Sequence, residues 1–175
     1  VCIVKDENGK KKYENVYKNE NIGDSSVARH AEMFFISDKY LREQLQPNQI
    51  ITLYLTFQPC HYSGGHYRAN NMSCTESLIH FHEKVLKHLN ISLKIRFAYL
   101  YRAHWKIIEP KYEEMVHNAN VGLKLLLDHF DVKVIDDNDI TELIPYFDEN
   151  TKNMWDNSCY DSIIQERKPL NDFIT

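Results

Sequence analysis

The sequence has no long hydrophobic run and few cysteines. None of its apolar stretches approaches the roughly 20 residues that a membrane span requires, and the chain opens in VCIV without the charged and apolar regions of a signal peptide. We therefore expect a soluble protein without a membrane partner, and processing from a longer chain stays open. Four cysteines in 175 residues are too few for a disulfide-dense scaffold. A chain of this length can bury a hydrophobic core without such bridges.

An excess of basic charge is also absent. The formal net charge is -4, so the chain as a whole lacks the basic surface that supports tight, salt-dependent binding of nucleic acid. Any contact with a polynucleotide must be local or weak. The sequence shows no internal repeat, low-complexity tract or linker, and it predicts a single domain over residues 1–175.

The first half of the chain alternates between strand and helix patterns. Apolar and aromatic residues flank Asn8 and Gly9, a pair that favours a hairpin with a type I′ turn. A helical spacing of apolar residues follows over 27–45 and ends before Pro47. Residues 49–58 are β-branched and aromatic without a breaker, which predicts a buried central strand.

The second half continues the alternation. Ser73 and Glu76 form a Ser-x-x-Glu capping box, which predicts a helix whose first residue is Cys74. Further on, the pattern predicts a strand, a helix, a second strand and a helical tail, over 91–101, 110–130, 131–136 and from Asp139 onward. Strands that alternate with helices of this length imply a mixed α/β sheet sandwiched by helices.

These placements bring three metal-ligating side chains toward one place. His30 lies in the first turns of a helix, Cys60 follows a strand, and Cys74 begins the next helix. One imidazole and two thiols suit zinc, whose catalytic sites keep three protein ligands and an open fourth position. The positive end of a helix dipole also favours the thiolate of Cys74. Active sites in open α/β sheets lie beyond the carboxyl ends of strands, where Cys60 falls.

Glu32 is the carboxylate closest to these residues in sequence. In the middle of a helix, two residues spaced as His30 and Glu32 are would point about 200° apart. Near a helix start, both side chains lean toward the N-terminal end and can reach a site beyond it. Ser25 and Ser26 are N-cap residue types placed before this helix, and they support that arrangement.

The identity of the third ligand stays open, because thirteen residues separate Cys60 from Cys74. His61 and His66 lie between them and are rival third ligands. A local disulfide between the two cysteines is a further alternative.

Several motifs resemble those of a known family. His-Ala-Glu at 30–32, followed by Pro59-Cys60 and a further cysteine, resembles the signature of zinc-dependent cytidine deaminases. More narrowly, the stretches ARHAEMFFISD, LYLTFQPC and FAYLYRAHW resemble the catalytic helix start, a strand end and a later strand with its loop in the AID/APOBEC polynucleotide deaminases. The similarity extends from the first hairpin through VKVID, and the order of elements also matches. The separation of the two cysteines is longer than the family's.

The resemblance implies a fold and a chemistry. The fold is the α/β, cytidine deaminase-like three-layer fold, a mixed five-stranded sheet sandwiched by helices. His30, Cys60 and Cys74 would bind Zn²⁺, and Glu32 would act as the catalytic proton shuttle of a hydrolase. The reaction would convert cytosine to uracil in single-stranded DNA or RNA, bound locally and with moderate affinity. The substrate-binding residues implied in this way are Asn21 (with Asn19 as the alternative), Phe57, Gln58, Tyr101 and Arg102.

Two rival functions stay open at this stage. One is a deaminase of free cytidine, deoxycytidine or their nucleotides, which the acidic net charge favours. The other is a catalytically inactive deaminase-like module that keeps a structural zinc and binds nucleic acid or protein. Because Glu32 is not expected to be a ligand, its presence favours catalysis over the inactive module.

Cysteines 2 and 159 lie outside the expected metal site. They could form a disulfide in an oxidising compartment, or both could be unpaired thiols of an intracellular protein. Sequons at Asn71 and Asn90 agree with the first alternative. We expect the secreted branch of the family, with a role in innate immunity that follows from the resemblance, and keep a cytoplasmic or nuclear protein as the alternative.

Overall fold

The structure is a computed structural model that describes residues 1–20, 30–62, 72–100 and 110–147. Its centre is a five-stranded sheet in the order β2-β1-β3-β4-β5. The strands are β1 Cys2–Lys5, β2 Lys11–Asn15, β3 Ile50–Phe57, β4 Ser92–Tyr99 and β5 Asp131–Val134. β1 is antiparallel to both β2 and β3, whereas β3, β4 and β5 run parallel. The sheet is therefore mixed, as predicted, and β3 is its central strand.

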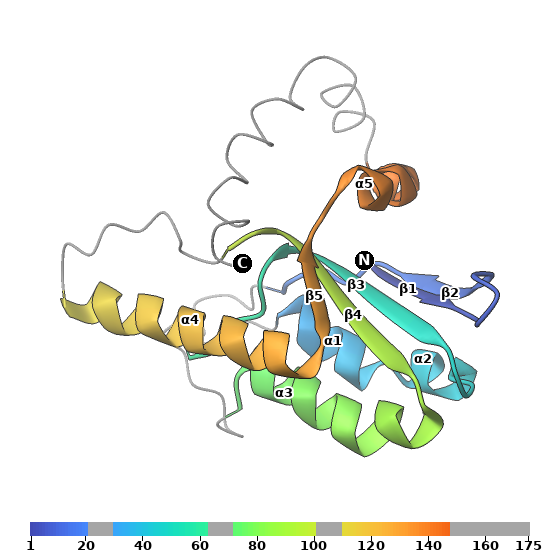
Figure 1. Cartoon of the computed structure of the whole chain (residues 1–175), viewed down its shortest axis with the longest axis horizontal. Coiled ribbons are helices and arrows are strands. Elements are labelled where there is room, and N and C mark those ends of the chain that lie inside the picture. The colour runs from blue at the N-terminus through green and yellow to red at the C-terminus, as the bar shows by residue number, and fades with distance from the viewer. Residues whose placement is uncertain (21–29, 63–71, 101–109, 148–175) are drawn as a thin grey trace, which may run out of the picture.

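Helices cover both faces of this sheet. They are α1 Ala31–Ser37, α2 Lys39–Gln44, α3 Cys74–Phe81, α4 Pro110–His129 and α5 Asp137–Leu143. A π-helical segment, His82–Leu86, and a 3-10 turn, Lys87–Leu89, continue α3, and a second 3-10 turn, Ile144–Tyr146, follows α5. Figure 1 shows α1 to α4 on one face and α5 on the other. This three-layer α/β arrangement is consistent with the predicted cytidine deaminase-like fold. Within the described residues, none of the helices combines the length and apolar character of a membrane span.

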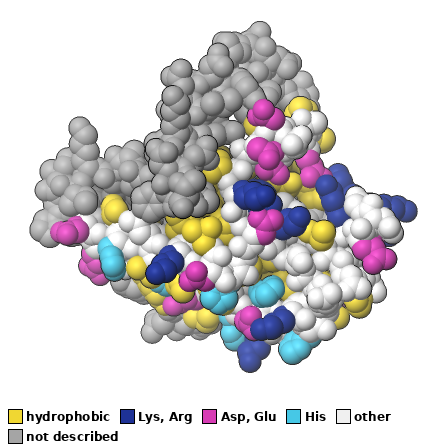
Figure 2. Space-filling model, in the orientation of Figure 1, with side chains coloured by type: hydrophobic (Ala, Val, Ile, Leu, Met, Phe, Trp, Pro, Cys, Tyr) yellow, Lys and Arg dark blue, Asp and Glu magenta, His cyan; other side chains and the backbone are white. Residues whose placement is uncertain are grey.

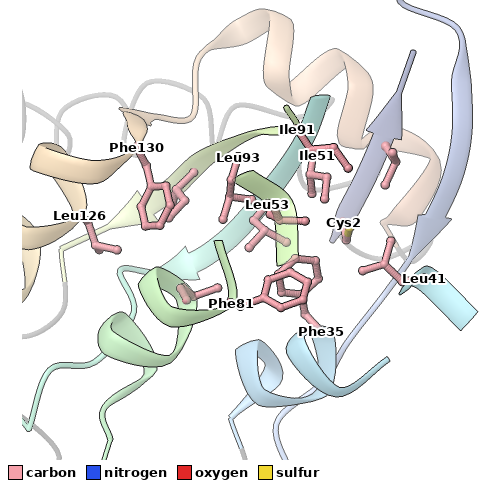
Figure 3. Close-up of a cluster of buried hydrophobic side chains, with 14 of the residues drawn as sticks. Cys2, Phe35, Leu41, Ile51, Leu53, Phe81, Ile91, Leu93, Leu126 and Phe130 are labelled. Atoms are coloured by element: carbon pink, nitrogen blue, oxygen red, sulfur yellow. The ribbon is translucent and has the colours of Figure 1, made fainter. Parts of the chain in front are cut away.

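The main core lies between the sheet and the helices α1 to α4. Alternate residues of the strands point to this side, because side chains along a strand change face at every step. The labelled side chains in Figure 3 come from both layers: Cys2, Phe35, Leu41, Ile51, Leu53, Phe81, Ile91, Leu93, Leu126 and Phe130. The rings of Phe35 and Phe81 meet edge to face, with centroids 5.4 Å apart. Each such side chain contributes about 1.5–3 kcal/mol when fully buried, and this core joins the sheet to the helices α1 to α4.

A smaller core lies on the other face, beneath α5. Ile3 and Tyr54 from the sheet pack there with Ile140 and Leu143 of α5. The Tyr54 hydroxyl donates a hydrogen bond of 2.9 Å to Glu142. α5 thereby closes the face of the sheet that α1 to α4 leave open.

The first hairpin forms as predicted, but its turn is different. A type I′ turn needs positive φ at both central residues, whereas only Gly9, at 78°, has positive φ in this turn. The side chain of Asp6 accepts hydrogen bonds from the backbone N–H groups of Asn8, at 3.0 Å, and Lys10, at 2.9 Å. These bonds organise a longer loop, and the predicted type I′ turn is wrong.

The single helix predicted over 27–45 is also wrong. The described part of that stretch forms two helices, α1 and α2, which separate at Asp38. Asp38 is extended, with φ -68° and ψ 107°, and its side chain caps α2 by accepting from the N–H of Leu41 at 3.0 Å. Its other carboxylate oxygen accepts from the hydroxyls of Tyr13, at 2.7 Å, and Tyr17, at 2.6 Å. An aspartate bonded in this way favours a cap over a helix interior.

Candidate metal centre

The end of β3 and the start of α3 are tied together by Thr75. This residue is fully buried. Its backbone N–H donates to the carbonyl of Cys60 at 3.1 Å, and its hydroxyl donates to the carbonyl of Pro59 at 3.2 Å. Cys60, beyond the strand, and Cys74, at the helix start, are therefore held next to each other.

The predicted capping box at the start of α3 is confirmed. Ser73 Oγ accepts from the N–H of Glu76 at 3.1 Å, and the Glu76 carboxylate accepts from the N–H of Ser73 at 2.9 Å. The same carboxylate accepts a short hydrogen bond from the hydroxyl of Tyr62. Cys74 is the first residue of the helix, as predicted. The segment between the two cysteines is thus held near both ends, by the hydrogen bond of Tyr62 to Glu76 and by the capping box of Ser73.

Helix α4 packs tightly against the same junction. The amide nitrogen of Gln58, a residue only 4 % exposed, donates to the carbonyl of Ala119 at 2.8 Å. A Cβ atom placed on Gly122 would lie 2.4 Å from the Cβ of His61, closer than packed carbons can come. His61 is 7 % exposed and its Nδ1 lies 3.1 Å from Ser73 Oγ. Gln58, predicted to bind substrate, therefore gives its amide N–H to the helix.

His30 stands at the start of α1, as the sequence predicted. It is the N-cap residue, with φ -77° and ψ 151°, and its own side chain makes no capping hydrogen bond. The N–H of the next residue, Ala31, donates instead to Oδ1 of Asn19 at 2.8 Å. Asn19 thus accepts the kind of hydrogen bond expected of Ser25 and Ser26. Ser25, Ser26 and Asn21 all lie outside the described residues.

The three predicted ligands come together. The ligand atoms of His30, Cys60 and Cys74 all lie within 4.8 Å of one another. His30 Nδ1 is 3.2 Å from the sulfur of Cys74 and 3.4 Å from that of Cys60. Ligand atoms around one tetrahedral zinc lie about 3.5 Å apart, given Zn–N and Zn–S bonds of about 2.0–2.3 Å. The group could therefore hold a metal ion.

The structure bears on the two alternatives to Cys74 as third ligand, a local disulfide and a ligating histidine. Cys60 and Cys74 are both free thiols, which contradicts a local disulfide. His61 is not part of the metal-ligating group found among the described residues, and His66 lies outside them. A hydrogen bond from Cys74 lowers the pKa of the Cys60 thiol to about 4; burial opposes this shift, and a contact with His30 adds to it. A thiolate at Cys60 is the form that binds metal.

A pocket of about 560 Å³ opens beside this group. His30, Cys60 and Glu32 line it, together with residues at the end of β3. Glu32 is 9 % exposed and is not among the three clustered ligands. Phe57 also lines the pocket, is 47 % exposed, and packs its ring against Tyr99 with centroids 5.8 Å apart. Gln58 and Asn19 belong to the same lining. Tyr101 and Arg102 lie outside the described residues.

The remaining predicted positions stay untested. Cys2 is a completely buried free thiol in the main core, and burial raises its pKa to about 12. Cys159 lies outside the described residues, so the pairing of these cysteines stays a prediction. Asn71 also lies outside them, while Asn90 is exposed and its side chain donates to Asn48 at 2.7 Å. Glycosylation of either sequon stays a prediction.

Two supporting residues were not found from the sequence. Thr75 carries no local pattern that indicates its bonds to Pro59 and Cys60. Gly122 does carry a signal, because a glycine inside a helical pattern indicates close approach by another segment.

Comparison with protein-family models gave no match, and comparison with curated proteins gave none either.

Proposed function

We propose that this protein is a zinc-dependent deaminase of the AID/APOBEC type, which converts cytosine to uracil in single-stranded DNA or RNA. One observation carries the proposal. An imidazole and two thiols converge within 4.8 Å, and a buried carboxylate that is not one of the clustered ligands lines the same pocket. A purely structural zinc site has no need of that carboxylate.

The donor set fits zinc better than the other common biological cations. Magnesium and calcium prefer oxygen ligands, whereas thiolates combined with imidazole favour zinc. His30, Cys60 and Cys74 would hold the ion. When bound with an open position, zinc lowers the pKa of a coordinated water to about 7.

Glu32 would carry the protons of the reaction. Deamination adds the elements of water at C4 of cytosine, breaks the C4–N4 bond and releases ammonia. Protons must therefore pass from water to N3 of the ring and to the departing amino nitrogen. A carboxylate oxygen of Glu32 can accept and return them, as a general base and then a general acid. Its burial limits competition from bulk water at that step.

The pocket supports a nucleotide substrate. A volume of about 560 Å³ lies within the range of about 300–1,000 Å³ usual for small-molecule sites. The exposed ring of Phe57 in the pocket lining offers an aromatic face for a base, and such stacking is worth about 1–3 kcal/mol for each base. Secretion and a role in innate immunity belong to the same proposal and rest on the family resemblance.

The test is a deamination assay with the zinc-loaded protein. Short single-stranded DNA and RNA oligonucleotides that differ in one central base, together with free cytidine and deoxycytidine, are incubated and read by mass spectrometry. We expect a mass increase of about 1 Da only for cytosine-containing strands. Turnover of the free nucleosides alone would establish the rival small-substrate enzyme. No turnover by protein with stoichiometric zinc would favour the inactive binding module.

The role of Glu32 has its own variant. Glu32→Gln should lower the rate of uracil formation at least about a hundredfold, because a general acid–base is lost, while the zinc content stays unchanged. Glu43→Gln removes an exposed carboxylate of α2 and serves as the matched control. Equal activity in Glu32→Gln and the unmodified protein would refute the proton-shuttle role.

A further inference from the structure

A second pocket lies at the opposite end of the sheet. Its volume is about 330 Å³, and it is lined by the π-helical segment after α3, the end of α4 and the first residues of β4 and β5. β4 and β5 run parallel to β3, whose last residues approach the metal centre. The second pocket therefore faces away from that centre and shares no residue with it.

The lining of this pocket is basic, although the chain as a whole is acidic. Its cationic or protonatable residues are His82, Lys87, Lys94 and His129. Figure 2 shows histidine and lysine side chains on this face, over the end of α4 and the helical segment that follows α3, with acidic side chains between them. Among the described residues, Asp131 is the only carboxylate in the lining. With two lysines against one aspartate, and with burial lowering the pKa of His82, the lining carries a small excess of positive charge on a chain of net charge -4.

The nearby carboxylates already have cationic partners. Arg96 binds Asp131 with a side-chain contact of 2.9 Å and a second hydrogen bond to its carbonyl at 2.8 Å. Glu83 binds Lys87 at 2.8 Å, but both side chains are largely exposed. An exposed ion pair of this kind contributes less than about 1 kcal/mol, so Lys87 can turn to another anion. Lys94 has no ion pair within the described part of the chain.

His82 adds an unsatisfied polar atom to this lining. Its Nδ1 is buried and makes no hydrogen bond within the described part of the chain. The closest carboxylate oxygen, from Glu83, is 3.7 Å away, beyond hydrogen-bond length. A buried polar atom without a partner costs about 1–3 kcal/mol, and such atoms in folded proteins call for an explanation. His82 also begins the π-helical segment, and such segments occur frequently at functional sites.

We propose that this pocket binds a phosphate group. Two ammonium groups, the imidazole of His82 and the hydroxyl of Ser92 supply hydrogen-bond donors, which suits an anion with several acceptor oxygens. The pocket is larger than one phosphate, and Phe130, Ile91 and Leu93 form an apolar wall for part of an attached group. The phosphate can belong to a free nucleotide or to the backbone of a nucleic-acid strand. The site stands apart from the metal centre and does not depend on deaminase activity.

The experiment is a titration of the isotope-labelled protein followed by NMR. The probes are inorganic phosphate, uridine 5′-monophosphate and a thymidine oligonucleotide, none of which contains cytosine. We expect each probe to shift the signals of Lys87, Lys94 and the His82 ring. Tighter binding of the mononucleotide than of the oligonucleotide identifies a free nucleotide as the source of the phosphate, and the reverse order identifies a strand.

Two variants separate a built site from general attraction between charges. Lys94→Gln should weaken phosphate binding about tenfold, because a charge-assisted hydrogen bond is lost. Lys10→Gln makes the same charge change at the exposed hairpin turn and should leave the affinity unchanged. Lys87→Gln repeats the test if Lys94→Gln does not fold. Absence of shifts at the pocket with all three probes, or equal weakening in the Lys10 and Lys94 variants, would overturn the proposal.

Discussion

Within the described residues, the cysteines of the candidate metal centre lie at a junction held by several hydrogen bonds, whereas the helix start that carries its histidine shows fewer. On the cysteine side, Thr75 bonds to the carbonyls of Pro59 and Cys60, and Ser73 and Glu76 cap α3 reciprocally. On the histidine side, His30 makes no capping bond and one amide oxygen, from Asn19, accepts from the next N–H.

This difference teaches which part of the site the polypeptide arranges by itself. The thiols are positioned by backbone bonds and close packing that need no ion. Among the described residues, one side-chain hydrogen bond supports the start of α1, from the N–H of Ala31 to Asn19, so we expect the imidazole to depend more on the ion for its position. Ligands whose side chains or backbone are held by further hydrogen bonds bind metal more tightly. Substitutions on the cysteine side and on the histidine side should therefore differ in their effect on metal affinity.

The largest effect should follow from removing a thiol. Cys74→Ala should reduce the zinc in purified protein from stoichiometric to almost none, measured by elemental analysis. Cys2→Ala is the matched control: it removes a buried thiol from the core, costs about 1–2 kcal/mol of folding free energy, and should keep its zinc. Full zinc in Cys74→Ala would move the third ligand to His61 or His66.

The next effect should come from the contact between α4 and the cysteine junction. Gly122→Ala forces a Cβ toward that of His61, 2.4 Å away, and should cost about 1–3 kcal/mol in urea unfolding while weakening zinc binding. Asn120→Ala makes an exposed change in the same helix and should be neutral or slightly stabilising. An unchanged zinc affinity in Gly122→Ala would show that α4 does not support the thiols.

A smaller effect should separate capping near the metal from capping elsewhere. Both α3 and α5 begin with a capping box, at Ser73 and Asp136. Ser73→Ala and Asp136→Ala should each cost about 1 kcal/mol of stability. Only Ser73→Ala should weaken zinc binding, as measured by competition with a chelator. Equal zinc affinities in the two variants would show that the capping box of α3 does not help to position Cys74.

The smallest effect is expected on the histidine side. Asn19→Ala removes the acceptor for the N–H of Ala31 and should cost no more than about 1 kcal/mol. Asn19→Asp keeps an acceptor at a helix N-terminus and should restore stability. A loss of zinc affinity in Asn19→Ala larger than that in Ser73→Ala would reverse the comparison.

Local patterns predicted the framework of the site correctly. The Ser-x-x-Glu box placed the start of α3 at Cys74 although thirteen residues separate it from Cys60. The β-branched run placed β3 at the centre of the sheet, and the strand and helix ends then brought the ligands together. These features depend on residues that are close together in the sequence, so they can be recognised from the sequence of one protein.

The errors and omissions depend on partners far away in sequence. Asp38 interrupts the predicted helix because the hydroxyls of Tyr13 and Tyr17 reach its carboxylate. The bond from Gln58 to Ala119 joins residues 61 positions apart, and no local pattern reports it. Asn19 caps a helix that starts twelve residues later, beyond the range of any capping motif.

The carboxylate of Asp38 has a consequence for removing the metal. Partial burial opposes its ionisation, but hydrogen bonds from Tyr13 and Tyr17 outweigh burial and lower its pKa to about 2. A lowered pKa stabilises the folded state above the unfolded value of about 3.9, and this contribution is lost only as the pH falls toward 2. Histidine and cysteine ligands release zinc at milder acidity, because protons compete for them. Asp38 should therefore keep its contribution to stability while mild acid and a chelator remove the metal ion.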